Sequence, residues 1–324
     1  MPVLVTGSAG FIGAKVTEML LDQGQTVVGI DNLNDAYDVQ LKHWRLRQLD
    51  GRVGFSFERL DITDRERLTR LFARENAFDA IINLAARAGV RQSVEDPWTY
   101  FETNVMGTLN LLELCRQHGV PKFLQASSSS VYGASTAVPF QEDADTSHPI
   151  SPYAASKQAA ETLCYTYHHL YGMDITVFRY FTVYGPAGRP DMSPFRFVQW
   201  LSEGQPLLVY GDGTQSRDFT YVDDIARGTI AALGLTGHHV LNLGSDHPIV
   251  LTEVIAQFEQ LLGKTATLDR RPPQSTDVPS TWADITQARA LLNWQPQTAF
   301  AEGAARLVDW YLANRSWARG LKTA

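Results

Sequence analysis

The chain has 324 residues, of which 44% are hydrophobic, and its net charge is −7 at pH 7. This length and composition predict a globular protein with one large domain or two closely joined domains. The acidic balance disfavours nucleic acid and anionic membrane surfaces as partners, and no apolar run approaches the roughly 18 residues of a membrane span. No signal-peptide pattern precedes the first predicted strand, so we expect a cytoplasmic protein.

The two cysteines predict neither a disulfide nor a metal site. Cys115 and Cys164 lie 49 positions apart, which matches no metal-ligand or redox spacing. We expect buried thiols in a reducing compartment and no bound metal.

The N-terminal segment predicts a dinucleotide-binding turn. The apolar run Val3–Thr6 is followed at once by Gly7-Ser8-Ala9-Gly10-Phe11-Ile12-Gly13, and apolar residues then recur at helical spacing. Glycines let the backbone approach a pyrophosphate, and the N-terminus of the helix supplies N–H donors. A second predicted strand ends at Asp31, 18 residues after Gly13. A carboxylate there would meet the adenosine ribose hydroxyls and repel a 2′-phosphate, which favours NAD over NADP.

Alternating strands and helices follow, and they predict a Rossmann-type, doubly wound parallel sheet. Gly7, Asp31, Ala85 and Ser127 all fall at the carboxyl ends of predicted strands, where such sheets bind ligands. The segment 33–51 indicates a loop and a charged helix without assignable chemistry. The expected strands are 3–6, 26–31, 53–59, 79–84, 122–126 and 174–179, with helices near 98–118 and 153–171.

Beyond residue 180 the regular alternation ends. We expect a long Gly- and Pro-rich loop over 182–192, a helix over 194–202, a strand over 206–210 and a helix opened by 217–224. The predicted α/β organisation is an NAD-binding domain over 1–180 with a return segment at about 218–245, and a smaller substrate-binding domain from 181–217 and 246–324.

Tyr153 and Lys157 lie four residues apart at the start of a predicted helix, so they share one helix face. A phenol with a pKa near 10 is a poor base at neutral pH. A nearby ammonium and a cationic nicotinamide ring would both favour phenolate, and lowering this pKa by about 3 units corresponds to roughly 4 kcal/mol. Ser128, 25 residues before Tyr153, would give a hydroxyl to the same reacting oxygen.

These residues together resemble the extended short-chain dehydrogenase/reductase family, in its nucleotide-sugar branch. The resemblance implies that Tyr153 is the base, that Lys157 holds the nicotinamide ribose and that Ser128 shares the proton of the substrate hydroxyl. It also implies that Arg217 holds a diphosphate, that Asp277 contacts the nucleotide ribose, and that the protein is a homodimer. The implied NAD-contacting residues are Gly7, Gly10, Phe11, Ile12, Gly13, Asp31, Asn32, Asp61, Ile62, Leu84, Ala85, Ala86, Tyr153 and Lys157.

Within this branch the motifs look like those of the UDP-glucuronate 4-epimerases. The matching segments are Phe181–Pro186, Gly188–Met192 and Ala88–Arg91. The resemblance implies that hydride leaves C4 of a UDP-sugar for NAD, and that it returns to the other face of a transient 4-keto sugar. The departures are Arg87, Gln92, Tyr180 and Ala187, where the subgroup is expected to carry Gln, Tyr, Phe and Trp, and Thr276, where a Gly is expected.

Ser130 separates an epimerase from related decarboxylases and dehydratases, which by the same resemblance carry Glu just before Val-Tyr-Gly. In those enzymes the Glu acts as an acid or base at the C5 or C6 side of the sugar, a role that a neutral hydroxyl fills poorly at neutral pH. Ser129, Ser130 and Thr182 are expected to bind a C5 carboxylate by hydroxyl donors, with Arg189 adding charge or binding the diphosphate. The expected function is therefore 4-epimerisation of UDP-glucuronate to UDP-galacturonate with the carboxylate retained.

Alternatives stay open from the sequence. The chain could be a 4-epimerase of a neutral UDP-hexose, or less favourably a UDP-glucuronate decarboxylase or a noncatalytic NAD-binding scaffold. At single positions, the Ser run could be a polar cap between strand and loop. Arg189 could be a solvent-facing loop residue, and Asp61 could simply begin a helix.

Overall fold

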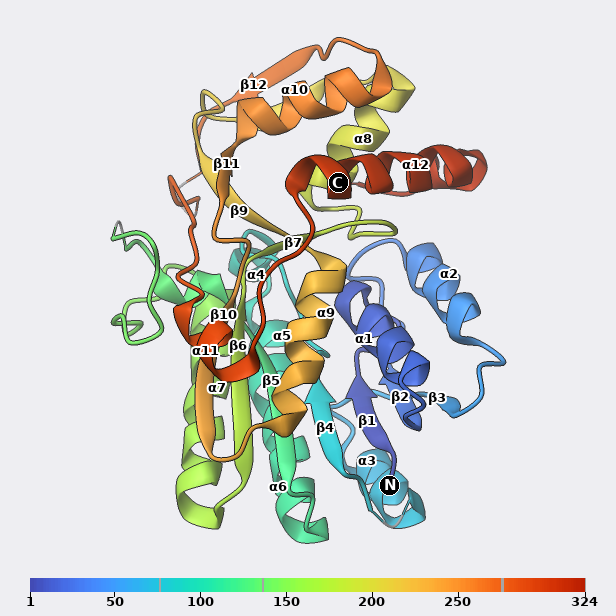
Figure 1. Ribbon diagram of the computed structural model, residues 1–324, viewed down its shortest axis with the longest axis vertical. Helices are drawn as coiled ribbons and strands as arrows, with labels where there is room; N and C mark the ends of the chain where they lie inside the picture. Colours follow the sequence, from blue (N-terminus) through green and yellow to red (C-terminus); the bar gives the residue numbers. More distant parts are fainter. Residues whose placement is uncertain (76, 136, 275–276, 324) are drawn as a thin grey trace.

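A computed structural model describes residues 1–75, 77–135, 137–274 and 277–323. Thr276 lies outside these residues. Figure 1 shows a lower part built around a large sheet and an upper part of shorter elements, with the C-terminus in the upper part.

The large sheet confirms the predicted Rossmann-type parallel architecture. Its seven strands are all parallel, in the order β10-β6-β5-β4-β1-β2-β3. The strand order reverses between the neighbours β1 and β4, and such a reversal opens a crevice for a ligand beyond the carboxyl ends of the strands. The strands are β1 Val3–Thr6, β2 Val27–Asp31, β3 Phe55–Arg59, β4 Ala80–Asn83, β5 Lys122–Ser128, β6 Asp174–Tyr180 and β10 His238–Leu243.

Helices cover both faces of this sheet (Figure 1). In β1, Val3 and Val5 pack into one core with Val16 and Ile225, whereas Leu4 packs into the opposite core with Leu111. This alternation follows from the two-residue period of a strand, and apolar runs are typical of strands buried on both faces. One face carries α1 Phe11–Asp22, α9 Val222–Ala231 and α11 Thr286–Leu292, with α2 Val39–Leu49 outside α1; the other carries α3 Arg65–Glu75, α4 Gln92–Glu95, α5 Pro97–Phe101, α6 Gly107–His118 and α7 Pro152–Tyr171.

The helix α7 is placed by its own end signals. The Ser151 hydroxyl accepts a hydrogen bond from the N–H of Ala154 at 3.1 Å, and Pro152 occupies the first helical position. At the other end Gly172 adopts a left-handed φ of 66°. In its second turn Lys157 donates to the Ala126 carbonyl of β5 at 2.8 Å, so the first two turns of the helix lie beside the carboxyl end of β5, on the ligand side of the sheet.

The predicted helix over 98–118 is confirmed, since helical turns run without a break from Pro97 to His118, but the helix widens in its middle. A π-helical segment, η1 Glu102–Met106, separates α5 from α6. Inside it, the Asn104 amide accepts from the N–H of Arg87 at 2.8 Å and donates to the Arg87 carbonyl and the Ser156 hydroxyl. Wide turns of this kind often mark functional sites, and here the turn supports the loop that follows β4.

The upper part forms its own core and corrects two expectations. Thr182–Tyr184 is not loop but strand β7, because it pairs with β9 Ser216–Tyr221. Arg217 through Tyr221 accordingly lie in a strand, and the helix α9 begins only at Val222. The remaining elements are β8 Leu207–Tyr210, β11 Pro248–Val250, β12 Leu268–Arg271, α8 Ser193–Glu203, α10 Leu251–Leu262, α12 Phe300–Ala318 and the short 3-10 turns Ser129–Tyr132 and Ala232–Gly234.

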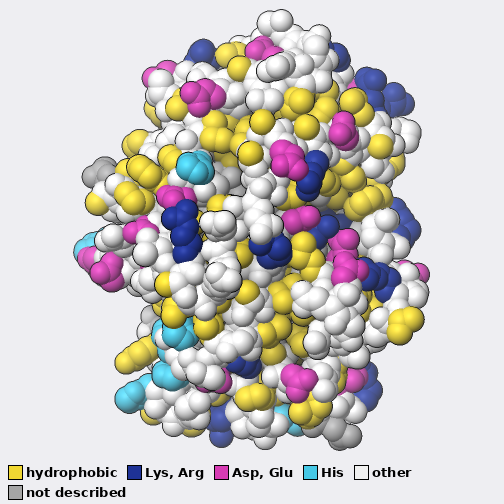
Figure 2. Space-filling view, viewed as in Figure 1, with side chains coloured by type: hydrophobic (Ala, Val, Ile, Leu, Met, Phe, Trp, Pro, Cys, Tyr) yellow, Lys and Arg dark blue, Asp and Glu magenta, His cyan; other side chains and the backbone are white. Residues whose placement is uncertain are grey.

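The surface in Figure 2 shows Lys and Arg side chains interspersed with Asp and Glu over one face, without a field of a single sign. Among the described residues, no helix is long and apolar enough to cross a membrane.

Candidate active site

One cavity of about 560 Å³ lies at the carboxyl ends of the central strands and continues beneath the upper part. Every residue that the sequence predicts for the site lines it. They are Gly7, Gly10, Phe11, Ile12, Gly13, Asp31, Asn32, Asp61, Ile62, Leu84, Ala85, Ala86, Ser128, Ser129, Ser130, Tyr153, Lys157, Thr182, Arg189, Arg217 and Asp277.

The glycine turn between β1 and α1 is packed too tightly for side chains. Gly7 has a left-handed φ of 68°, and a Cβ on it would lie 2.8 Å from the backbone nitrogen of Ala85. A Cβ on Gly13 would lie only 2.0 Å from the Gly7 carbonyl oxygen. Gly7, Gly10 and Gly13 also line the cavity beside the first turn of α1, where backbone N–H groups can approach a pyrophosphate, so these residues fit a bound dinucleotide.

Asp31 is held at the end of β2 by two donors. Its Oδ1 accepts from the N–H of Leu33 at 2.8 Å and from the Lys42 ammonium at 3.2 Å. Lys42, on α2, was missed from the sequence because its helix carries no motif. Both side chains are buried, so the carboxylate is fixed in place with its charge partly balanced.

Asp61 does not simply begin a helix. Its carboxylate accepts from the Asn32 amide at 2.6 Å and from both the N–H and the hydroxyl of Thr63 at 2.8 Å. Burial raises the pKa of Asp61, but these hydrogen bonds outweigh it and hold the pKa below its ordinary value. Asp61 therefore orients Asn32 at the cavity wall.

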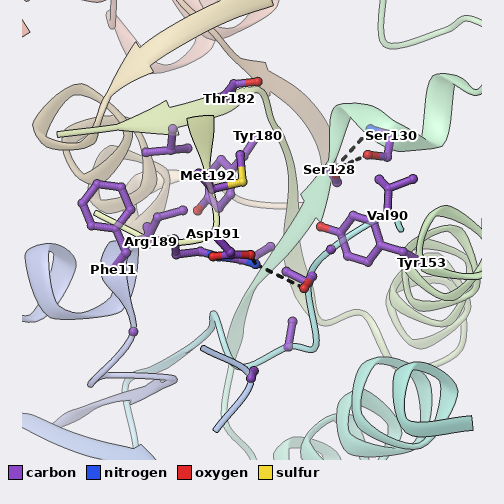
Figure 3. A pocket seen from close by; sticks show the side chains of 18 of the residues that line it. Phe11, Val90, Ser128, Ser130, Tyr153, Tyr180, Thr182, Arg189, Asp191 and Met192 are labelled. Atoms are coloured by element: carbon purple, nitrogen blue, oxygen red, sulfur yellow. Dashed lines mark hydrogen bonds and ion pairs between the residues drawn. The ribbon is translucent and has the colours of Figure 1, made fainter. Parts of the chain in front are cut away.

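Ser128, Tyr153 and Lys157 come together where β5 ends and α7 begins. The Tyr153 hydroxyl points into the cavity beside Ser128 (Figure 3). The Ser128 hydroxyl also accepts from the N–H of Ser130 and donates to its hydroxyl, both at 3.1 Å. Tyr153 packs edge-on against Tyr100, with ring centres 6.1 Å apart.

The pKa values of Tyr153 and Lys157 are both shifted in the direction that disfavours the charged form. Burial raises the pKa of Tyr153, against the opposing effects of Ser128 and Arg189. Burial lowers the pKa of Lys157 to about 8, against the favourable charge of Glu161. Lys157 donates to the Ala126 carbonyl at 2.8 Å. Burial therefore favours the neutral phenol of Tyr153, and it brings the pKa of Lys157 closer to neutral pH while the ammonium form still predominates at pH 7.

A buried ion pair lies one turn further along α7. Glu161 accepts from Arg179 on β6 through both carboxylate oxygens, at 3.2 and 2.9 Å, and both side chains are at most 10% exposed. Glu161 also accepts from the Ser127 hydroxyl, next to Ser128 in the chain. Through these contacts Glu161 anchors α7 to β6 and to β5, the strand that carries Ser128.

Arg189 is half-buried rather than solvent-facing, and it lies across the cavity from Tyr153 (Figure 3). It pairs with both carboxylate oxygens of Asp191, at 3.1 and 2.6 Å, and donates to the Ala88 carbonyl at 3.2 Å. The pair raises the pKa of Arg189 despite its burial. Sequence reasoning missed Asp191, although it stands only two positions further on. Arg189 therefore faces the cavity with its charge largely balanced.

The far end of the cavity gathers three arginines. Arg91 pairs with Asp277 at 2.7 Å and lies 4.0 Å from the centre of the Tyr210 ring. Burial, and then the charge of Arg91, lower the pKa values of Arg196 and Arg217. Arg91 and Arg196 were not predicted. Three guanidinium groups near one carboxylate make this end positive, which suits a diphosphate.

Comparison with known proteins agrees with this geometry. The family model for the NAD dependent epimerase/dehydratase family matches residues 3–244. The chain is 53% identical to UDP-glucuronate 4-epimerase of Thermodesulfobacterium geofontis over 98% of each chain. Its structure also matches the crystal structure of UDP-glucuronic acid 4-epimerase from Bacillus cereus in complex with UDP-glucuronic acid and NAD, with a TM-score of 0.92. The two sequences are 37% identical, and the match covers 97% of this chain and all of that one. A UDP-glucose 4-epimerase from Thermotoga maritima is 30% identical over 97% of this chain and all of that one, with a TM-score of 0.88. The match over most of the chain confirms the resemblance seen in the motifs, and this protein belongs to the NAD dependent epimerase/dehydratase family.

Proposed function

We propose that the protein catalyses NAD-dependent 4-epimerisation of UDP-glucuronate to UDP-galacturonate through a transient 4-keto intermediate, with the carboxylate retained. The observation that carries this proposal is the set of neutral hydroxyls at Ser128, Ser130 and Thr182 along the wall beside Tyr153. No acid stands at Ser130 to drive proton chemistry at C5. The likeness to UDP-glucuronate 4-epimerases over nearly the whole chain supports it.

Tyr153 takes the proton of the 4-hydroxyl, and Ser128 shares that hydrogen bond. When bound, NAD supplies reversible hydride transfer at C4 of the sugar. The buried Tyr153 phenol needs a nearby positive charge to ionise, and Arg189 already acts to lower its pKa. We assign the further charge to the Lys157 ammonium, one turn along the same helix face, and to the nicotinamide ring of bound NAD. Lys157 is also placed to hold the nicotinamide ribose. The ring of Tyr153 is buried and packs edge-on against Tyr100, which fixes the direction of its hydroxyl.

To retain the carboxylate, the residues around the sugar must prevent decarboxylation of the 4-keto intermediate. A 4-keto uronic acid is a β-keto acid, which loses carbon dioxide when its breaking bond overlaps with the ketone. We assign Ser129, Ser130 and Thr182 to holding the carboxylate away from that alignment, with Arg189 adding charge. Arg217 binds the diphosphate and Asp277 the nucleotide ribose.

A 4-epimerase of a neutral UDP-hexose is the second candidate. Asp191 balances the charge of Arg189, so this wall is less positive than Arg189 alone would make it. The structural likeness to a UDP-glucose 4-epimerase is compatible with this candidate too.

The deciding experiment is incubation of the purified protein with UDP-glucuronate, without added reductant, followed by separation of the products. We expect UDP-galacturonate. Conversion of UDP-glucose alone would favour the neutral hexose, a UDP-pentose would indicate decarboxylation, and no turnover of either sugar would leave only an NAD-binding scaffold.

Replacing Arg189 with Ala is expected to raise KM for UDP-glucuronate about ten- to hundredfold, because a hydrogen bond to a charged group contributes about 1.5–3 kcal/mol. Its loss also leaves the Asp191 carboxylate unpaired beside the substrate carboxylate, so some UDP-pentose should appear. Asp191→Asn is the matched variant, since it keeps Arg189 and should lower KM. Unchanged KM and product purity in Arg189→Ala would exclude a role for this residue.

We further propose that residues 1–180, with a return segment at about 218–245, hold NAD, and that 181–217 and 246–324 bind the nucleotide sugar. We also propose a cytoplasmic homodimer formed through the helices near 100–118 and 153–171. In support, exposed apolar side chains lie along these helices, among them Trp98, Phe101, Met106, Tyr165, Leu170 and Tyr171. Light scattering tests the dimer, and a single-chain mass would exclude it.

A further inference from the structure

The helix α2, to which the sequence assigns no chemistry, places a buried arginine between two walls of the cavity. Arg45 is 3% exposed. Its Nε and Nη2 donate to the Ala187 carbonyl at 3.0 and 2.6 Å, and Nη2 also donates to the Gly188 carbonyl at 3.2 Å. Its Nη1 donates to the Ala9 carbonyl at 3.2 Å and to the Tyr37 hydroxyl at 2.8 Å. Within the described residues every hydrogen-bond acceptor of this guanidinium is neutral.

The partners of Arg45 belong to two segments that are far apart in the sequence. Ala9 lies in the glycine turn that approaches a dinucleotide, 36 residues before Arg45. Ala187 and Gly188 lie 142 and 143 residues after it, in the loop 185–192 that carries Arg189 and leads into α8. One guanidinium thus joins the wall that fits the cofactor to the wall that faces the sugar.

The loop needs such an anchor. Ala187 has a left-handed φ of 52°, which is unfavourable for a residue with a Cβ and persists only where surrounding contacts impose it. Two of the hydrogen bonds of Arg45 end on this carbonyl. The guanidinium also lies 5.7 Å from the centre of the Phe11 ring, and Phe11 lies beside the loop, since a Cβ on Gly188 would be 3.7 Å from its Cζ; both Phe11 and Arg189 line the cavity (Figure 3). The planar guanidinium of Arg45 donates in fixed directions from three nitrogens, an arrangement that the single nitrogen of a Lys ammonium does not reproduce.

We propose that Arg45 is a positioning residue that couples the cofactor-binding glycine turn to the substrate-facing loop 185–192. This proposal rests on the proposed function in one respect, because it assumes that the loop 185–192 closes on a nucleotide sugar. UDP can act on this loop through its diphosphate, because Arg196 lies at the positive end of the cavity and donates to the Asp191 carbonyl of the loop at 3.5 Å. A ligand that holds the loop in place then also holds the glycine turn, through Arg45. Because such coupling is reciprocal, the nucleotide should slow the loss of NAD, and NAD should strengthen binding of the nucleotide.

The test measures how fast bound NAD leaves the purified holoenzyme, with and without saturating UDP. Wild type is compared with Arg45→Met, which keeps the length of the side chain without its donors. Arg47→Met is the matched control, because Arg47 is an exposed arginine on the same helix. Arg45→Lys keeps the charge and serves as the conservative variant, and it carries the test if Arg45→Met does not fold.

We expect UDP to slow the loss of NAD tenfold or more in wild type and in Arg47→Met, less than twofold in Arg45→Met, and to an intermediate extent in Arg45→Lys. An equal effect of UDP in wild type and in the Arg45 variants would overturn the proposal, as would no effect in wild type. Turnover of UDP-glucuronate is measured separately. A wild-type protein that epimerises this sugar without the UDP effect would refute the coupling alone, and the UDP effect without turnover would refute the proposed reaction alone.

Discussion

Tyr153→Phe is expected to lose turnover by about 10²- to 10⁴-fold, the range usually supplied by a positioned acid or base. The substitution removes only the phenol oxygen. The aromatic ring and its edge-on packing against Tyr100 remain, so the fold and the NAD content should be unchanged. The measurements are kcat on UDP-glucuronate, the NAD released on denaturation and the thermal midpoint.

Tyr165→Phe is the matched control, because Tyr165 lies on the same helix with 56% of its surface exposed. Its kcat should equal that of wild type. Wild-type turnover in Tyr153→Phe would refute the assigned mechanism. A loss of turnover accompanied by a loss of NAD would instead place Tyr153 among the cofactor-binding residues only.

Arg179→Met is expected to lower the free energy of unfolding by about 3–5 kcal/mol, the usual effect of leaving one member of a buried ion pair alone. The Glu161 carboxylate would keep the Ser127 hydroxyl but lose both guanidinium hydrogen bonds in a site that water barely reaches. The measurement is unfolding in urea, followed by circular dichroism.

The double variant Arg179→Met, Glu161→Gln should recover part of this loss, because it removes the uncompensated charge as well. Arg70→Met supplies the comparison with an exposed pair: Arg70 and Glu66 form an ion pair on the surface of α3, and such pairs contribute only about 0.3–0.5 kcal/mol. Equal losses in Arg179→Met and Arg70→Met would show that the buried pair does not stabilise the fold.

The fold of the lower part could be predicted because its signals are local. An apolar run such as Val3–Thr6, a glycine turn and a helical repeat each occupy a few consecutive residues, and their order alone implies a parallel sheet. The strand β7 could not be predicted in this way. Thr182–Tyr184 precedes a Gly- and Pro-rich segment and becomes a strand only through pairing with β9, more than 30 positions later.

The candidate site likewise contains residues that the sequence predicts and residues that only the folded structure brings there. The spacing from Tyr153 to Lys157 and the position of Asp31 after a strand are visible in the sequence. The partners that tune these side chains are not. Lys42 reaches Asp31 from a helix without a motif, and Asn104 supports Arg87 only because the helix around it widens. Contacts between segments far apart in the chain depend on the folded geometry, which no short pattern records.

The seventh strand has a consequence for how the chain can be cut or synthesised. β10 covers the outer edge of β6, yet it is contributed by residues 238–243, after the chain has passed through much of the upper part. A fragment ending at residue 180 would leave β6 as a long, apolar open edge, the kind of edge that recruits other chains into aggregates. On the ribosome, the sheet can close only when residue 243 has emerged. The lower part therefore cannot complete its sheet before much of the upper part has been synthesised. We do not expect either part to be soluble as a fragment made by dividing the chain at one position.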